Sequence, residues 1–341
     1  MSDVSSRSVP VLGRALPGWA FPLGVVASVC FVLAYVQPFG VSRDYLEYDS
    51  FFDSLRSSGL SELSITRFEP GFVVSAFLLI SVLANNLAVY GVLASLSLSV
   101  KAVVTAAFSR RPYALAIAFA LYVARFIPIH ELTQLRASMS IAALLVAFLF
   151  HWRHKRALFV LACCVAISLH MSSVFIVPFL AFSVFKRTHV LLIAVGGFFL
   201  VRIALEGLVT YLAPDLPVLA LYEAAFAGGE ILQTHNPWSL ALLLDVGMLL
   251  SGIVLWESLS GPMRHVLLLE AVGLAFFYGA IDLPIFALRV REMCDVFWCI
   301  YVAEGVTRRP WLRALCVVYV MANIVGYVQI NFFNYDDPLF R

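Results

Sequence analysis

Long apolar runs alternate with short polar intervals along most of this chain. Crossing the hydrocarbon core of a membrane takes about 20 apolar residues. Runs near that length predict helices at 19–39, 70–84, 87–108, 113–129, 137–152, 157–186, 190–212, 238–256, 264–281, 293–306 and 312–331. The pattern therefore predicts about ten to twelve crossings.

One of these runs is too long for a single crossing. The segment 157–186 has the polar sequence His170-Met171-Ser172-Ser173 near its middle. Two short helices broken at this point are typical of segments that line a cavity, because exposed backbone is tolerated at membrane depth only there or inside protein.

Composition supports a membrane protein. The 341 residues are 62% hydrophobic and only 13% charged, whereas about one quarter of a soluble domain is charged. We expect an all-α, polytopic integral membrane protein with one transmembrane domain over 1–341, whose run at 19–39 is a retained helix and not a cleaved signal peptide. The net charge of +2 gives no reason to expect binding to nucleic acid.

The six cysteines lie in or beside apolar runs. They lack the paired spacing of a zinc site or of a disulfide framework. We therefore expect them to be small core residues, and we expect neither a metal nor another cofactor.

The distribution of lysine and arginine predicts orientation. Basic clusters at Arg7/Arg14, Arg110/Arg111, 153–156, Lys186/Arg187, Arg264 and 308–313 are expected in the cytoplasm. This assignment places 40–68, 130–136, 213–237 and 282–292 outside, with 41–68 and 213–237 as the two long external loops. The two apolar runs within 70–108 suggest two membrane crossings, but an external Glu69 and a cytoplasmic Arg110 require an odd number of crossings between them. Part of that stretch is therefore expected to be interfacial or re-entrant.

Charged residues at helix ends gather on the predicted outer face. They are Arg43, Asp44, Glu47, Asp49, Arg67, Glu69, His130, Glu131, Arg136, His170, Asp282, Arg289, Arg291 and Glu292. Such groups are costly near a membrane and often mark a functional site. Arginines outside also oppose the orientation rule, and a guanidinium matches the oxygens of a phosphate, so Arg136, Arg289 and Arg291 are expected to bind an anion.

A structural alternative stands beside each of these interpretations. Arg43, Asp44 and Asp49 fit a solvated helix start, and Glu69 before Pro70-Gly71 fits an acid favoured by the helix dipole. His170 fits a core histidine bonded to a carbonyl, and Arg289 or Arg291 fits an internal pair with Asp282 or Glu292. His130 is more plausibly a boundary residue than a ligand.

Several short elements, in order, resemble the EpsG-like, Wzy-type polysaccharide polymerases. They are Asp44-Tyr45-Leu46-Glu47-Tyr48, Glu69-Pro70-Gly71-Phe72, Gln134-Leu135-Arg136-Ala137, the basic turn at 153–156, His170-Met171-Ser172-Ser173 and a late arginine, Arg289 or Arg291. Two departures stand out: Gln134 precedes Arg136 where the family has Arg-Gln, and Met293-Cys294 replaces an aromatic pair. The late arginine is thus assigned only to within one turn.

The resemblance implies a fold like that of C-type glycosyltransferases and an enzyme of the bacterial inner membrane. Such an enzyme polymerises repeat units linked to undecaprenyl diphosphate, or a similar polyprenyl diphosphate, into O-antigen or exopolysaccharide at the periplasmic face. The implied partners are lipid-linked glycan donor and acceptor, membrane lipid, and flippase and chain-length regulator proteins.

The chemistry of that reaction suggests a role for each residue. A carboxylate, Asp44 or Glu69, would take the proton of the attacking hydroxyl, with Asp44 slightly favoured, and arginines would stabilise the leaving diphosphate. The expected substrate-binding residues are Arg43, Tyr48, Arg67, Gln134, Arg136, His170, Arg289 and Arg291. The alternatives are a transporter or flippase, against which no internal repeat is visible, and a non-catalytic assembly protein.

Overall fold

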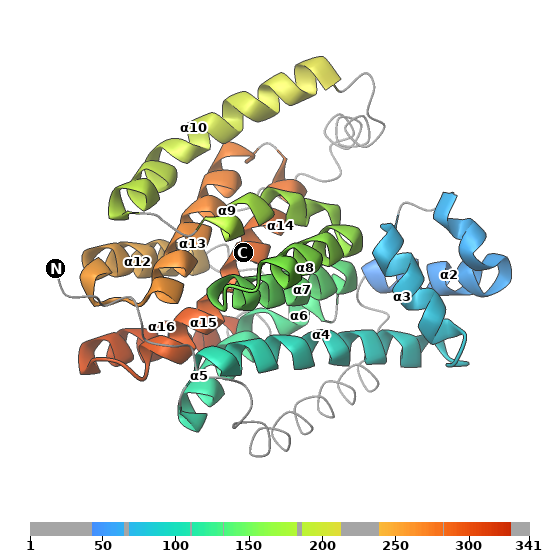
Figure 1. The fold of residues 1–341 in the computed structure, drawn as a ribbon, viewed down its shortest axis with the longest axis horizontal. Coiled ribbons are helices and arrows are strands. Elements are labelled where there is room, and N and C mark those ends of the chain that lie inside the picture. The colour runs from blue at the N-terminus through green and yellow to red at the C-terminus, as the bar shows by residue number, and fades with distance from the viewer. Residues whose placement is uncertain are drawn as a thin grey trace. The chain divides into compact units, whose positions relative to one another are not determined.

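The computed structural model describes residues 43–64, 68–109, 111–131, 133–182, 186–212, 239–281 and 283–328, and all regular elements in these ranges are helices (Figure 1). Two compact units share the chain, one from Met1–Leu180 with Cys299–Val320 and one from Ala181–Trp298 with Met321–Arg341. A single domain over 1–341 stays a prediction, and each unit is described by itself. The predicted helix at 19–39 and the predicted loop at 213–237 lie outside the described residues.

The first unit is built around α7, which packs along both α4 and α8. Asn85 begins α4 by accepting a hydrogen bond from the Leu87 N–H at 2.8 Å, and Pro112 stands at the start of α5, where a missing N–H costs nothing. The helices of this unit include α4 (Asn86–Phe108), α5 (Pro112–Arg125), α6 (Ile127–His130), α7 (Leu135–Trp152), α8 (Arg156–Leu169), α15 (Trp298–Gly305) and the part of α16 (Pro310–Val328) up to Val320.

The polar interval expected to be a loop over 41–68 is mostly helical, and the expectation of a loop was wrong. It forms α2 (Arg43–Ser58) and the 3-10 helix η3 (Gly59–Ser64). The side chains of Tyr48, Phe51, Phe52 and Leu55 are buried. Their spacing of i, i+3, i+4 and i+7 is that of one apolar helix face, which the many charged residues between them obscure. The external position of this segment stays a prediction.

Helix α3 (Pro70–Ile80) follows, and its length resolves part of the conflict over 70–108. Eleven residues span about 16 Å, roughly half the hydrocarbon core. By contrast, the 23 residues of α4 span about 35 Å. Only α4 therefore has the length to cross by itself.

The predicted break in the segment 157–186 is confirmed. Helix α8 ends at Leu169, and η4 (Met171–Phe175) and α9 (Val177–Ala181) follow. His170 lies between α8 and η4 with an extended backbone, φ −160° and ψ 117°. The change of direction places its side chain at the end of α8.

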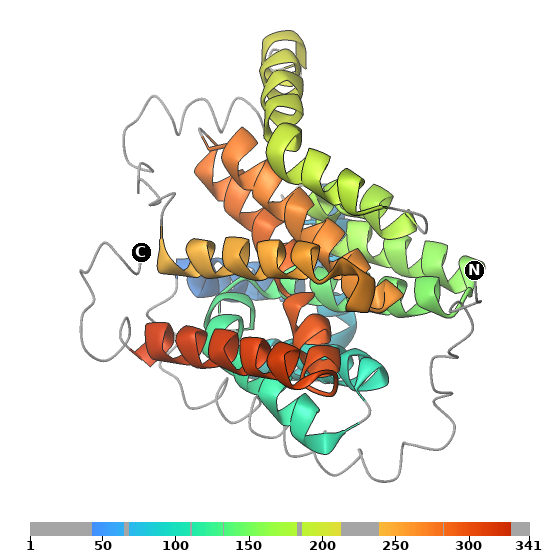
Figure 2. The same cartoon turned by 90° about the vertical axis from the view of Figure 1, so that its left-hand side faces the viewer.

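The second unit centres on α13 (Gly261–Gly279), which packs against α10 (Arg187–Leu212), α12 (Leu240–Val254) and α14 (Pro284–Asp295) (Figure 2). The short helix η6 (Trp256–Ser258) joins α12 to α13. Glycine allows α13 to approach α10, because a Cβ on Gly279 would lie 2.7 Å from the Phe198 carbonyl oxygen.

Helix α14 was not predicted. The interval 282–292 was expected to lie outside the membrane, between the predicted helices 264–281 and 293–306, but Pro284 begins a helix there. Its buried side chains include Ala287, Val290 and Cys294, again at helical spacing. Arg289, Arg291 and Glu292 gave the interval the polar composition of a loop.

Three described helices have the length and composition to cross a membrane, namely α4, α7 and α10 over Arg187–Leu205. On α10, five large apolar side chains expose more than half of their surface: Leu192, Val195, Phe199, Leu200 and Ile203. A lipid environment suits such a face, whereas water does not. The protein is thus an all-α membrane protein, and the number of crossings stays a prediction.

Candidate functional site

The first unit brings together the side chains of Glu69, Arg136 and His170. Glu69 Oε2 lies 2.6 Å from Nη1 of Arg136, and Glu69 Oε1 lies 2.9 Å from Nδ1 of His170. The Met171 backbone N–H also donates to Glu69 Oε1, at 3.1 Å. One carboxylate therefore joins the starts of α3, α7 and η4.

Glu69 occupies the N-cap position of α3, but its side chain does not cap that helix. Its backbone carbonyl accepts from the N–H groups of Phe72 and Val73 at 3.0 and 3.1 Å, while the carboxylate turns to Arg136 and His170. The reading of Glu69 as a simple helix N-terminal acid leaves these contacts unexplained.

Gly71 makes the meeting of α3 and α8 possible. A Cβ on Gly71 would overlap Ser168 Oγ and would lie 2.8 Å from both the carbonyl carbon and oxygen of Ser168. Two of these three atoms belong to the backbone and cannot rotate away. The Pro70-Gly71 pair after Glu69 thus starts α3 and lets it lie against the end of α8, next to His170.

Aromatic rings lie beside the charged groups. The Arg136 guanidinium carbon is 4.6 Å from the centroid of the Phe68 ring, a cation–π distance. Tyr48 of α2 stacks on Phe68 at 5.8 Å, and its hydroxyl oxygen accepts from the Arg136 backbone N–H at 3.3 Å. Helix α2 thus contributes to the site through Tyr48.

The charges around Glu69 keep it ionised. Burial alone would raise the pKa of Glu69, but the hydrogen bond from His170 and the positive charge of Arg136 outweigh it and hold that pKa at about 2. Burial raises the pKa of Tyr48, against the opposing effect of Arg136. At neutral pH, Glu69 is therefore a carboxylate and Tyr48 a neutral phenol.

Asp44 lies one helical turn before Tyr48 in α2. Its side chain is half-buried, and its negative charge adds to the rise in the pKa of Tyr48. Asp44 is thus close enough to Tyr48 to act on the phenol electrostatically, at the edge of the Glu69 site.

Gln134 directly precedes α7, two residues before Arg136. Its Oε1 atom and the Nε atom of Arg136 are buried and have no hydrogen-bond partner among the described residues. Buried polar atoms are usually paired, so a polar group of a ligand is a natural partner here. Both atoms belong to predicted site residues.

Of two other predicted residues of the N-terminal region, the structure describes Arg43 only in part and Arg67 not at all. The backbone of Arg43 begins α2, and Arg67 lies outside the described residues.

The two late arginines belong to the second unit. Arg289 is half-buried on α14. Arg291 is buried, with Nη2 at 2.5 Å from Asp245 Oδ2 and Nε at 3.4 Å from Asp295 Oδ2. Arg291 is therefore paired internally, as its structural alternative predicted, but its partners are Asp245 of α12 and Asp295 of its own helix, where Asp282 or Glu292 had been expected. Asp282 lies outside the described residues.

The two carboxylates that contact this arginine belong to a cluster of three. Asp245, Glu270 and Asp295 each place one oxygen within 4.8 Å of the others, and all three residues are buried. This is a donor set that could hold a cation, and Arg291 already supplies it with one positive charge. Sequence reasoning missed Asp245, Glu270 and Asp295, although each is a carboxylate inside an apolar run, which is a recognised signal of function.

Two residues of the first unit were also missed. Phe68 lies beside Arg136 but follows no motif that separates it from other aromatic residues. Lys101 lies inside the apolar run 87–108 and is 2% exposed. A single lysine in such a run is a signal of function, and it passed unnoticed.

Comparison with known proteins gives the family. The chain matches the EpsG family over residues 22–339. It belongs to the EpsG family. The match covers nearly the whole chain and confirms the resemblance, and it places this EpsG-family protein among the EpsG-like polysaccharide polymerases of exopolysaccharide biosynthesis. No curated protein and no solved structure matches the chain.

Proposed function

We propose that this EpsG-family protein is a glycosyltransferase that polymerises repeat units linked to a polyprenyl diphosphate, undecaprenyl diphosphate in bacteria. In this proposal the Glu69 site faces the periplasmic or external side of the cytoplasmic membrane. The observation that carries the proposal is the joining of Arg136, His170 and Tyr48 around one ionised carboxylate, beside buried polar atoms that a ligand would pair.

The reaction is one glycosyl transfer. The hydroxyl oxygen of the acceptor sugar forms a bond to the anomeric carbon of the donor glycan, and the bond from that carbon to the diphosphate oxygen breaks. The electron pair leaves with the diphosphate, and the hydroxyl proton goes to a base. The polyprenyl chain stays in the lipid while the sugars reach water, which favours a site near a membrane boundary.

Arg136 is the group that binds the leaving diphosphate. A guanidinium carries five N–H donors in one plane. The described contact of Arg136 with Glu69 uses one of them, on Nη1. Its buried Nε can donate to a phosphate oxygen. Charge that develops on the diphosphate is then stabilised by a donor already in place, which is the most effective form of electrostatic catalysis.

Glu69 serves mainly to hold Arg136 and His170. A carboxylate with a pKa of about 2 is a weak proton acceptor near neutral pH. Asp44, which lies at the edge of the site one turn from Tyr48, is therefore the better candidate for the base. His170 orients the diphosphate or the acceptor hydroxyl.

The aromatic rings suit a sugar. The rings of Tyr48 and Phe68 stack with their centroids 5.8 Å apart, next to the guanidinium. Their apolar faces can contact the face of a sugar ring, and the Tyr48 hydroxyl is a polar group for a sugar hydroxyl. Gln134, whose Oε1 lacks a partner among the described residues, would accept a hydrogen bond from a sugar hydroxyl.

The test is reconstitution of the purified protein in lipid vesicles with one lipid-linked repeat unit. Products are separated on a gel. A ladder of multiples of the repeat unit is expected. Movement of the intact lipid-linked unit across the bilayer without a ladder would show that the protein is a transporter and not a polymerase. If the protein produces no ladder and moves no lipid-linked unit, it would be assigned to assembly without catalysis.

A further inference from the structure

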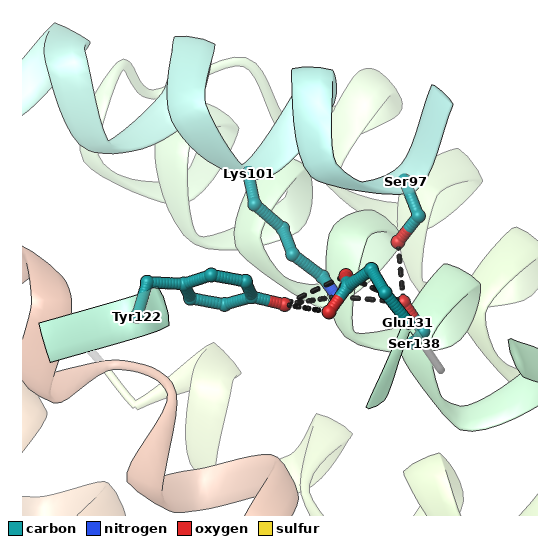
Figure 3. A network of polar contacts seen from close by, with 5 residues as sticks. All are labelled: Ser97, Lys101, Tyr122, Glu131 and Ser138. Atoms are coloured by element: carbon teal, nitrogen blue, oxygen red, sulfur yellow. Dashed lines mark hydrogen bonds and ion pairs between the residues drawn. The ribbon is translucent and has the colours of Figure 1, made fainter. Parts of the chain in front are cut away.

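A second polar network lies in the first unit, away from the Glu69 contacts, around Lys101 of α4 (Figure 3). The Lys101 ammonium donates to Glu131 Oε1 at 2.6 Å, to the Tyr122 hydroxyl at 2.8 Å and to Ser138 Oγ at 2.8 Å. Ser97 Oγ lies 2.7 Å from Ser138 Oγ. All five side chains are less than 5% exposed.

The donors and acceptors in this network match in number. An ammonium has three N–H donors, and Lys101 has three acceptors within 2.8 Å. The Tyr122 and Ser138 hydroxyls in turn donate to Glu131 Oε1, at 2.7 and 2.8 Å. The hydrogen of Ser97 can then go to Ser138. Fully satisfied buried networks are rigid.

The network joins four segments, the interior of α4 and the ends of three others. Ser97 and Lys101 belong to α4, Tyr122 to α5, Glu131 to the turn after α6, and Ser138 to α7. Figure 3 shows the five side chains converging on one point between these segments. The network thereby fixes the position of the first turn of α7.

Arg136 is in that same first turn. It lies between Glu131 and Ser138 along the chain, five residues after the one and two before the other. Two residues along an α-helix correspond to about 200° of rotation, so Ser138 leaves α7 on nearly the opposite side from Arg136. Contacts at Ser138 therefore hold the back of the helix while Arg136 faces Glu69 and Phe68.

A purely stabilising role explains this network poorly. Replacing a buried ion pair by apolar residues is often neutral or favourable for stability, and the best-attested benefit of such a pair is to specify one arrangement. The arrangement specified here is the start of the helix that carries Arg136.

We propose that Lys101 and Glu131 are positioning residues that hold the Arg136 guanidinium in its place for the diphosphate. This inference rests on the proposed function. Lys101 and Glu131 touch no substrate in it, and they act through the turn before α7.

The test is a double-mutant cycle of polymerisation rate between Lys101→Met and Arg136→Lys, measured per folded protein. Lys101→Met is expected to slow the wild-type enzyme about tenfold. In the Arg136→Lys background, the same change is expected to slow it by less than about threefold, because the guanidinium that it positions is already lost. An equal factor in both backgrounds would overturn the inference.

A milder variant keeps the test decisive if Lys101→Met does not fold. Tyr122→Phe removes one hydroxyl and retains the ion pair. Its matched control is Tyr319→Phe, which removes a buried hydroxyl that accepts from Arg125 Nη1 at 2.7 Å. Tyr122→Phe is expected to slow polymerisation and to do so only when Arg136 is intact, whereas Tyr319→Phe is expected to have the same effect in both backgrounds.

The two proposals fail differently. A wild-type protein that makes no ladder refutes the proposed function. A wild-type ladder together with additive effects at Lys101 and Tyr122 refutes only the positioning role.

Discussion

Glu69 Oε2 and Arg136 Nη1 lie 2.6 Å apart although their residues are 67 positions apart in the chain. The pair is mostly buried, with 13% of the Glu69 side chain and 16% of the Arg136 side chain exposed. A buried pair of this kind leaves an uncompensated charge when one partner is removed. The two residues therefore act as one unit, and their substitutions are expected to affect more than the residue that is changed.

The first prediction concerns the guanidinium of Arg136. Arg136→Lys keeps the charge but loses the planar fork, and it is expected to reduce the polymerisation rate at least about tenfold, because a point charge cannot make the bidentate contact to a diphosphate. The measurement is the rate of ladder formation in vesicles. Arg125→Lys is the matched control, since Arg125 also lies over an aromatic ring, at 5.3 Å from Phe126. Equal rates for both variants would mean that Arg136 does not bind the diphosphate.

The second prediction separates Asp44 from Glu69. Asp44→Asn is expected to abolish chain growth with little change in stability, because it removes the proposed base. Glu69→Gln is expected to lower both activity and stability, because Arg136 and His170 lose the carboxylate between them. Chain length on a gel and thermal unfolding in detergent measure the two effects. Long chains from Asp44→Asn with single units from Glu69→Gln would invert the assignment.

The third prediction is a pH dependence of stability that comes from Glu69. Its pKa falls from 4.5, the ordinary value, to about 2 in the folded protein, so the folded state favours the carboxylate. The stabilisation is complete above about pH 4.5 and is lost as the pH falls toward 2, and it amounts to on the order of 3 kcal/mol. Unfolding of the wild type and of Glu69→Gln from pH 7 to pH 3 measures it. A difference between the two proteins that stays constant down to pH 3 would contradict the shift.

The fourth prediction tests the close approach of α3 and α8. Gly71→Ala is expected to destabilise the protein by about 1–3 kcal/mol and to reduce activity, because its methyl group would displace the backbone of Ser168. Ser168→Ala should not restore either property, since backbone atoms also block the methyl group. Gly247→Ala is the control, because a Cβ there meets nothing within 4 Å. Normal stability of Gly71→Ala would show that the two helices can separate without cost.

The fifth prediction is the topology. In a background without native cysteines, a cysteine replacing Ser57 should react with a membrane-impermeant label in intact cells, and one replacing Lys155 should not. Both positions are exposed, so accessibility within the protein does not decide the result. The reverse labelling pattern would place the Glu69 site on the cytoplasmic side and would contradict the proposed orientation.

Local features of the chain were enough to predict its class and several site residues. Apolar runs, the scarcity of charge and the interruption at His170 depend on a residue's near neighbours, so the helical membrane fold and the broken segment could be inferred directly. Tyr48, Glu69, Arg136 and His170 could be chosen as candidates because polar groups beside a membrane boundary are costly. The same reasoning failed for α2 and α14, where charged residues conceal an apolar helix face.

Pairing was decided only by the tertiary structure. Glu69 and Arg136 meet because Gly71 lets α3 lie against α8 and because α7 begins at Leu135, and no local pattern contains these two facts together. Arg136 and Arg291 are alike in the sequence, as arginines near the start of a helix or within a polar interval. Packing places Arg136 next to the mostly buried carboxylate of Glu69 and beside buried polar atoms that lack partners among the described residues. It pairs Arg291 with the buried Asp245 instead. The two arginines differ because a charged group pairs with whichever group the fold brings within reach.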